Sequence, residues 1–177
     1  IIYCGDGRLH DNDNEEIRHI EFVKQNLSSL GFKSSQFTAN ETMDERMELV
    51  DSFNEGAIDA LAAIRCLDEG INIPSIKGAM ILSSNDDFRE FVQRRGRILR
   101  TYKDKKYANI YDIIVLPSYN TPKIAEIEFR RFHEYARLAI NKDLLMPQLE
   151  NLTSEYNLVL EDFITQFDED KEVNLDD

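Results

Sequence analysis

The stretch Gln93-Arg94-Arg95-Gly96-Arg97-Ile98-Leu99-Arg100 places four arginines within eight residues. Arg94, Arg97 and Arg100 recur at every third position, so on a helix or a tight turn they project from neighbouring positions toward one small volume. Crowded positive charges repel one another unless an anion lies among them, and the guanidinium fork matches the oxygens of a phosphate. The pattern indicates either a polyphosphate-binding cluster or an exposed basic face neutralised by solvent and nearby carboxylates.

A second block, Asp68-Glu69-Gly70-Ile71-Asn72-Ile73-Pro74, lies upstream at the end of an apolar run. The two blocks together resemble motifs V and VI of superfamily 2 helicases and translocases. The form Gln-Arg-x-Gly-Arg-x-Leu-Arg is most similar to the excision-repair helicase branch and to the type I/III restriction-subunit branch, whereas the DEAD-box branch begins this motif with His. The resemblance covers roughly residues 1–116 and implies the second RecA-like domain of such a motor.

The resemblance implies catalytic roles in the arginine block. Arg97 and Arg100 occupy the positions of arginine fingers, which place positive charge against the phosphoryl oxygens when two domains close. Gln93 lies where the family has a Gln or His near the γ-phosphate.

The resemblance also implies a nucleotide-binding role for parts of both blocks. Asn72 falls where many relatives have an Asp that contacts the ribose, and Gly70 serves the path of the backbone beside it. Arg94 is a third candidate for contact with the cofactor. Pairing of Arg94 with a carboxylate such as Asp68 or Glu69 is an equal alternative.

Outside these blocks, strand and helix patterns alternate, which is typical of a parallel α/β sheet. The strands expected from apolar runs are Ile1–Cys4, Phe32–Thr38, Ile58–Ile64, Gly78–Ser83 and Tyr107–Leu116, the last with apolar residues consistent with burial on both faces. The helices expected from apolar spacing are residues 15–30, a helix opened by the capping box Thr42–Glu45 with an apolar face of Met47, Val50 and Phe53, and Phe88–Arg94. We therefore predict a RecA-like parallel sheet of about six strands sandwiched by helices.

Several loops of this predicted sheet follow strands, and ligands of parallel sheets bind at the carboxyl ends of the strands. Gly5, Asp6 and Gly7 follow the first strand, Thr38 and Asn40 the second, and Arg65 the third. By resemblance, the first two loops match motifs IV and IVa, which hold one nucleic-acid strand by its sugar-phosphate backbone, and such contacts position the strand without reading its sequence. An ordinary strand-to-helix turn at Gly5–Gly7 and a surface role for Arg65 are the alternatives.

The pattern changes beyond Pro117, which divides the chain into residues 1–117 as the RecA-like domain, 118–167 as a helical extension and 168–177 as an acidic disordered tail. A long helix is expected from Pro122, with Phe129, Phe132 and Ala136 on one stripe that should pack onto the motor domain. Met146-Pro147 predicts a break or a new helix start.

Composition indicates an ordinary soluble chain with a local basic region. The 34 acidic and 21 basic residues give a formal charge of −13, yet residues 93–137 hold eleven basic against five acidic side chains. No apolar run reaches membrane-spanning length, so no membrane partner is expected. The two cysteines and three scattered histidines lack metal-ligand spacing, which favours a reduced cytoplasmic setting and no metal site.

A complete motor of this kind also needs a phosphate-cradling loop and a Mg²⁺-holding Asp-Glu pair, and neither occurs in this sequence. We therefore expect ATP with Mg²⁺ to be bound mainly by a first, N-terminal RecA-like domain of the same protein, with nucleic acid, more DNA than RNA, as the second partner. This chain alone should be inactive. Two alternatives remain: a non-catalytic RecA-like docking or regulatory module, and a stand-alone nucleotide-binding α/β enzyme.

Overall fold

The computed structural model describes residues 1–10, 15–64, 73–83, 88–103, 105–118 and 122–161. The chain divides into two compact units, Ile1–Ile113 and Ile114–Asp177, and each is described by itself.

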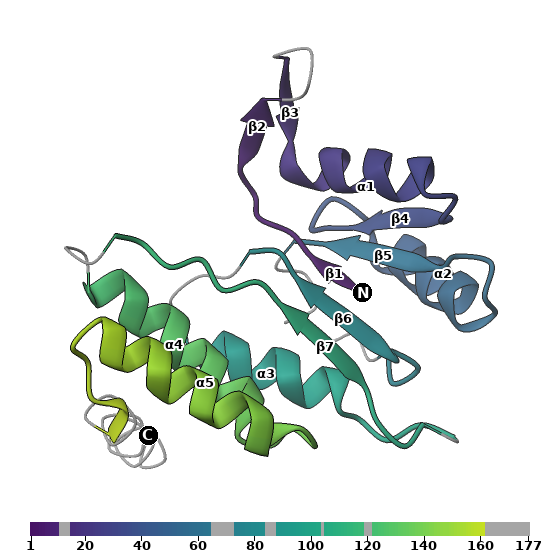
Figure 1. Ribbon diagram of the computed structural model, residues 1–177. Coiled ribbons are helices and arrows are strands. Elements are labelled where there is room, and N and C mark those ends of the chain that lie inside the picture. Colours follow the sequence, from purple (N-terminus) through teal and green to yellow (C-terminus); the bar gives the residue numbers. More distant parts are fainter. Residues whose placement is uncertain (11–14, 65–72, 84–87, 104, 119–121, 162–177) are drawn as a thin grey trace, which may run out of the picture. The chain divides into compact units, whose positions relative to one another are not determined.

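Among the described residues, the first unit contains a parallel sheet, a small hairpin and three helices (Figure 1). Its strands are β1 (Ile2–Tyr3), β2 (Arg8–His10), β3 (Glu16–Arg18), β4 (Ser34–Phe37), β5 (Ala60–Ala63), β6 (Gly78–Ile81) and β7 (Asn109–Asp112). Its helices are α1 (His19–Ser29), α2 (Met43–Asn54) and α3 (Phe88–Ile98).

Five strands form the parallel sheet in the order β4-β5-β1-β6-β7. The expected α/β class and RecA-like parallel sheet are confirmed, but the expected count of about six strands is wrong for the described residues. Strands β2 and β3 pair with each other as a separate antiparallel hairpin instead of joining the sheet.

Helices cover both faces of the sheet, as the alternation of side chains along β1 makes clear. Ile2 packs with Ile20 and Val23 of α1, in a cluster that also contains Ala62 of β5. The next residue, Tyr3, lies on the opposite face, where its ring meets the guanidinium of Arg94 from α3. The two layers therefore bury β1 between α1 and α3.

Helix α1 is shorter than expected, because Glu16–Arg18 belong to β3 and the helix begins at His19. It ends as predicted at Gly31, whose φ of +84° is a left-handed conformation that favours glycine. The N–H groups of Gly31 and Phe32 donate to the carbonyls of Ser28 and Leu27, so the helix ends in a Schellman motif.

Helix α2 begins at the predicted capping box, in which the Thr42 hydroxyl accepts from the Glu45 N–H and the Glu45 carboxylate accepts from the Thr42 N–H. The predicted apolar face is wrong at Met47, which is 58% exposed. The last strand is likewise not buried on both faces: β7 is an edge strand, and Tyr111 is 59% exposed.

The described part of the second unit contains a pair of helices, α4 (Pro122–Ala136) and α5 (Lys142–Glu155), which run side by side (Figure 1). The expected helical extension is confirmed, although α5 begins at Lys142 and keeps Pro147 inside it. Phe129 is fully buried against Leu149 and meets the Tyr156 ring edge-on, with ring centroids 5.5 Å apart.

Two charged side chains of α4, Arg131 and Glu134, are also buried. Arg131 forms a two-pronged ion pair with Glu128 at 2.8 and 2.9 Å, and Glu134 pairs with Arg137. Phe132 is half-buried at the edge of the core. The stripe therefore meets α5 within this unit, and charge pairing makes burial of its polar flank tolerable.

Candidate functional site

The carboxyl edge of the sheet gathers the loops that follow β1 and β4. Because these strands are parallel and only β5 separates them, Gly5–Gly7 and Thr38–Asn40 lie at one edge, about 10 Å apart by the usual strand spacing. The backbone ladder continues into this edge, since the Cys4 N–H donates to the Ala63 carbonyl at 2.8 Å. The third predicted contributor, Arg65, lies outside the described residues.

His19 ties both ends of the Gly5–Gly7 loop. The ring Nδ1 of His19 accepts a hydrogen bond from the Gly5 N–H at 3.0 Å. The backbone N–H of His19 donates to the Gly7 carbonyl at 2.9 Å. A Cβ on Gly5 would lie 3.0 Å from the Ser83 Oγ and 3.2 Å from the His19 Nδ1, so a larger residue here would force these neighbours to shift. Burial lowers the pKa of His19, which favours the neutral ring that this hydrogen bond needs.

Sequence reasoning missed His19, because it grouped this residue with two other scattered histidines. The contact forms when the β2–β3 hairpin folds back and brings the start of α1 beside Gly5. No local sequence pattern predicts this contact between His19 and Gly5.

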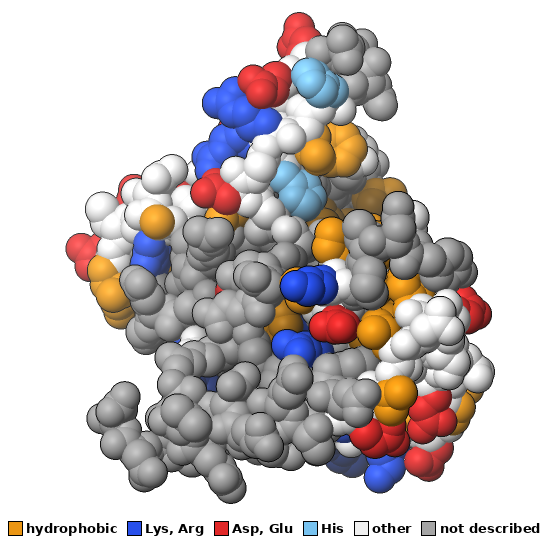
Figure 2. All heavy atoms as spheres, turned by 90° about the vertical axis from the view of Figure 1, so that its left-hand side faces the viewer, with side chains coloured by type: hydrophobic (Ala, Val, Ile, Leu, Met, Phe, Trp, Pro, Cys, Tyr) orange, Lys and Arg blue, Asp and Glu red, His pale blue; other side chains and the backbone are white. Residues whose placement is uncertain are grey.

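The hairpin carries charges of both signs next to the loop. Arg18 pairs with Asp6 at 3.5 Å, and Arg8 pairs with Glu16 at 3.0 Å, both at exposed positions. Figure 2 shows basic, acidic and histidine side chains gathered on this projecting part of the first unit. Asp6 therefore meets a basic partner, which offsets the repulsion that a bare carboxylate would exert on a phosphate.

The turn after β4 is organised by Glu41. The Thr38 N–H and hydroxyl donate to one Glu41 carboxylate oxygen at 2.5 and 2.8 Å, and Gln36 donates to the other at 3.0 Å. Burial alone would raise the pKa of Glu41, but these hydrogen bonds outweigh it and hold the pKa below its ordinary value. The buried Thr38 thus shapes the turn, while Asn40 is exposed.

The arginine block lies mostly on α3, which extends past its expected end at Arg94 to Ile98. Arg94 is buried, forms an ion pair with Glu90 one turn earlier, and places its guanidinium 4.8 Å from the centre of the Tyr3 ring. Arg97 is half-buried, whereas Gln93 and Arg100 are exposed, and Arg100 lies beyond the helix end. The arginines therefore do not share one environment.

The two sequence blocks meet in space at Lys105. Its ammonium donates to the carbonyls of Ile98 at 2.6 Å, Arg100 at 2.9 Å and Pro74 at 3.3 Å. The end of the upstream block and the end of the arginine block are therefore neighbours. Gly70 and Asn72 themselves lie outside the described residues, as do Asp68 and Glu69.

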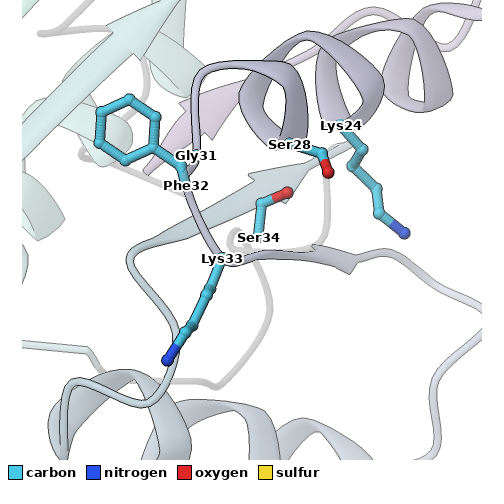
Figure 3. Close-up of a pocket in the computed structure, with 6 residues that line it drawn as sticks. All are labelled: Lys24, Ser28, Gly31, Phe32, Lys33 and Ser34. Carbon is cyan, nitrogen blue, oxygen red and sulfur yellow. The ribbon is translucent and has the colours of Figure 1, made fainter.

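A pocket of about 470 Å³ lies away from all of these residues, between the end of α1 and the start of β4. In Figure 3 the side chains of Lys24 and Lys33 point apart, and Phe32 points away from both. Because its polar groups do not converge, this pocket is not a candidate ligand site.

Within the described ranges, no group of three or more His, Cys, Asp or Glu side chains is placed to hold a metal ion. In the same part of the chain, no helix has the length and apolar character needed to cross a membrane.

Residues 10–102 match the family described as the helicase conserved C-terminal domain. A DNA 3'-5' translocase, XPB2, of Sulfurisphaera tokodaii is 38% identical over 63 residues, which are 36% of this chain and 14% of that protein. A putative DNA 3'-5' helicase, Rad25, of Halobacterium salinarum is 31% identical over 90 residues, covering 50% of this chain and 15% of that protein. The chain thus spans a small part of the length of these relatives.

Solved structures show the same fold. The C-terminal part of the Fun30 ATPase domain has a TM-score of 0.54 at 19% identity and covers 72% of this chain and 38% of its own. The C-terminal domain of the DEAD-box protein Dbp5 has a TM-score of 0.50 at 19% identity and covers 75% of this chain and 69% of its own.

Proposed function

This chain belongs to the helicase conserved C-terminal domain family, and from that premise we propose that it is the second motor domain of an ATP-dependent nucleic-acid helicase or translocase. In this role Arg97 and Arg100 are arginine fingers and Gln93 contacts the γ-phosphate. Gly70 and Asn72 line the nucleotide. A first RecA-like domain of the same protein holds most of the ATP and its Mg²⁺, so this chain by itself does not hydrolyse ATP.

The observation that carries the proposal is the meeting of the two blocks. The Lys105 ammonium binds the carbonyls of both Pro74 and Arg100, which are 26 positions apart in the sequence. The ends of the two blocks, Pro74 and Arg100, therefore lie next to each other, which supports a single nucleotide site shared by both blocks. Exposure of Gln93 and Arg100 leaves both accessible to a nucleotide held by another domain.

The nucleic-acid strand is proposed to run along the carboxyl edge of the sheet. Gly5, Asp6, Gly7, Thr38, Asn40 and Arg65 are the residues assigned to it. Thr38 acts by shaping its turn, because Glu41 engages its hydroxyl, and the exposed Asn40 reaches the backbone. We propose DNA over RNA because the arginine block begins with Gln, as in the excision-repair branch, and because the two relatives described above are named for DNA.

Substitution of the fingers in the full-length protein tests this function. Arg97→Ala and Arg100→Ala should each lower the rate of ATP hydrolysis by at least about a hundredfold, because developing charge on the phosphate loses its partner. Nucleotide affinity should fall far less, since most phosphate contacts come from the first domain. Arg95→Ala, on the same helix as Arg97, is the matched control.

Near-normal hydrolysis in both finger variants would contradict the proposal. It would favour the second candidate, a RecA-like docking or regulatory module whose arginines are structural.

A further inference from the structure

Lys105 places one positive charge at the C-terminal end of α3. The last carbonyls of a helix have no partner within the helix and carry the negative end of its dipole. An ammonium has three N–H donors, and here three carbonyl oxygens lie within 3.3 Å of it. Burial lowers the pKa of Lys105, so desolvation opposes the cation and the three carbonyls offset that cost.

The Pro74 side of this contact is fixed to the core. Ile73 and Ile76 are buried, and the Ser75 hydroxyl donates to the Asn54 side chain at the end of α2. The Pro74 carbonyl, which Lys105 contacts, therefore belongs to a segment that is held in place by the core.

The Arg100 side is held much less firmly by its own backbone. Leu99 closes the last helical turn with a 2.9 Å bond from its N–H to the Arg95 carbonyl, but the Arg100 N–H reaches the Arg97 carbonyl only at 3.4 Å. Arg100 lies two positions past the end of α3. Its main-chain carbonyl accepts the shorter 2.9 Å bond from Lys105.

We propose that Lys105 is a positioning residue for phosphoryl transfer, which sets the main chain of Arg100 against Pro74 at the end of the upstream block. This inference rests on the proposed function of Arg100 as a finger. Lys105 touches neither nucleotide nor reacting atoms in this role. It acts by holding the finger within the narrow range of positions that catalysis tolerates, where a misplacement of about 1 Å costs up to about a hundredfold in rate.

The test uses the full-length protein that contains this chain. Lys105→Met removes the ammonium and keeps most of the side chain, and Lys106→Met changes the exposed neighbouring lysine as the control. We expect Lys105→Met to lower kcat for ATP hydrolysis by about tenfold or more, with KM for ATP changed by less than about threefold. The assay is run well below the melting temperature of each variant, and Lys106→Met should match the natural protein.

A double-mutant cycle shows whether Lys105 acts through Arg100. In the Arg100→Ala background, Lys105→Met should lower kcat by less than about twofold, because the finger it positions is already gone. An equal effect of Lys105→Met in both backgrounds, or full kcat in a variant that merely melts earlier, would overturn the proposal.

If Lys105→Met does not fold, Lys105→Arg replaces it in the test. The positive charge then remains, but the planar guanidinium fits three converging carbonyls poorly. The kcat of Lys105→Arg should then fall with KM preserved, and unchanged kcat would overturn the proposal.

If Arg100→Ala itself hydrolyses ATP normally, the proposed function of Arg100 fails, and the inference about Lys105 fails with it. If Arg100→Ala hydrolyses ATP normally and Lys105→Met still lowers kcat in that variant, Lys105 is a structural residue instead.

Discussion

Arg94 and Arg97 are three residues apart on one helix yet differ in what surrounds them. Arg94 is 4% exposed, paired with Glu90 and stacked near Tyr3, so it holds α3 to β1. These contacts favour the structural alternative that the sequence left open for Arg94, with Glu90 as the partner. Removing Arg94 would leave the Glu90 carboxylate buried without this cation, which is costly.

His19 also shows how a single side chain sets local order. Its lowered pKa means that the folded chain binds fewer protons at this ring than the unfolded chain does. The stabilising contribution of neutral His19 is complete above the ordinary pKa of 6.5 and is lost as the pH falls through the lower folded value.

We therefore expect His19 to make the free energy of unfolding fall as the pH drops below about 6.5. His19→Asn should weaken that dependence, because its amide oxygen can accept the Gly5 N–H without titrating. Urea unfolding at about pH 7.5 and about pH 5.5 measures it, with His10→Asn, at an exposed position of β2, as the control. An equal stability difference between His19→Asn and the natural chain at both pH values would show that the ring does not titrate in this window.

At the scale of elements, the α4–α5 pair is a small core of its own. Ala125, Phe129 and Leu149 are fully buried, and the Tyr156 hydroxyl donates to the Pro117 carbonyl, which ties the end of α5 to the segment before α4. Phe129 is the largest of these buried side chains, while Phe132 stands at the margin.

Phe129→Ala should accordingly destabilise the helical unit by about 3–5 kcal/mol, through lost burial and a cavity that α5 cannot fill. Phe132→Ala should cost less, because its ring is only half-buried. Ile124→Ala, on the same helix but 53% exposed, should change stability by less than about 0.5 kcal/mol. Denaturant unfolding of the three variants gives the ranking, and a larger loss for Phe132 than for Phe129 would contradict this packing.

At the scale of the whole molecule, net charge opposes the proposed ligand. The formal charge of −13 repels a polyanion, while the proposed contacts are a few donors along one sheet edge. Affinity of this chain alone for nucleic acid should therefore be low and independent of base sequence.

Binding should also weaken steeply with salt, because contacts to phosphates release counterions. For two or three phosphate contacts, raising salt from about 50 to about 200 mM should lower the affinity for duplex roughly 10- to 40-fold. Titration of labelled duplex and single strand of two unrelated sequences measures this. Affinity that is insensitive to salt, or confined to one sequence, would count against backbone contacts.

The sequence by itself determined the five strands of the parallel sheet and the positions of its main helices, but not the β2–β3 hairpin. Apolar runs separated by turn residues are local signals, so β1, β4, β5 and β6 lie within their expected ranges and α2 begins at its capping box. The motif blocks likewise sufficed to identify the helicase C-terminal family.

Tertiary structure alone decided which of these residues meet. Whether one face of a strand is buried depends on what packs over that face, so the apolar run around β7 could not reveal that Tyr111 is exposed. The Gly5–His19 and Lys105–Pro74 contacts join residues 14 and 31 positions apart. Such contacts depend on how distant parts of the chain fold together. The spacing of apolar residues within one helix or strand does not predict them.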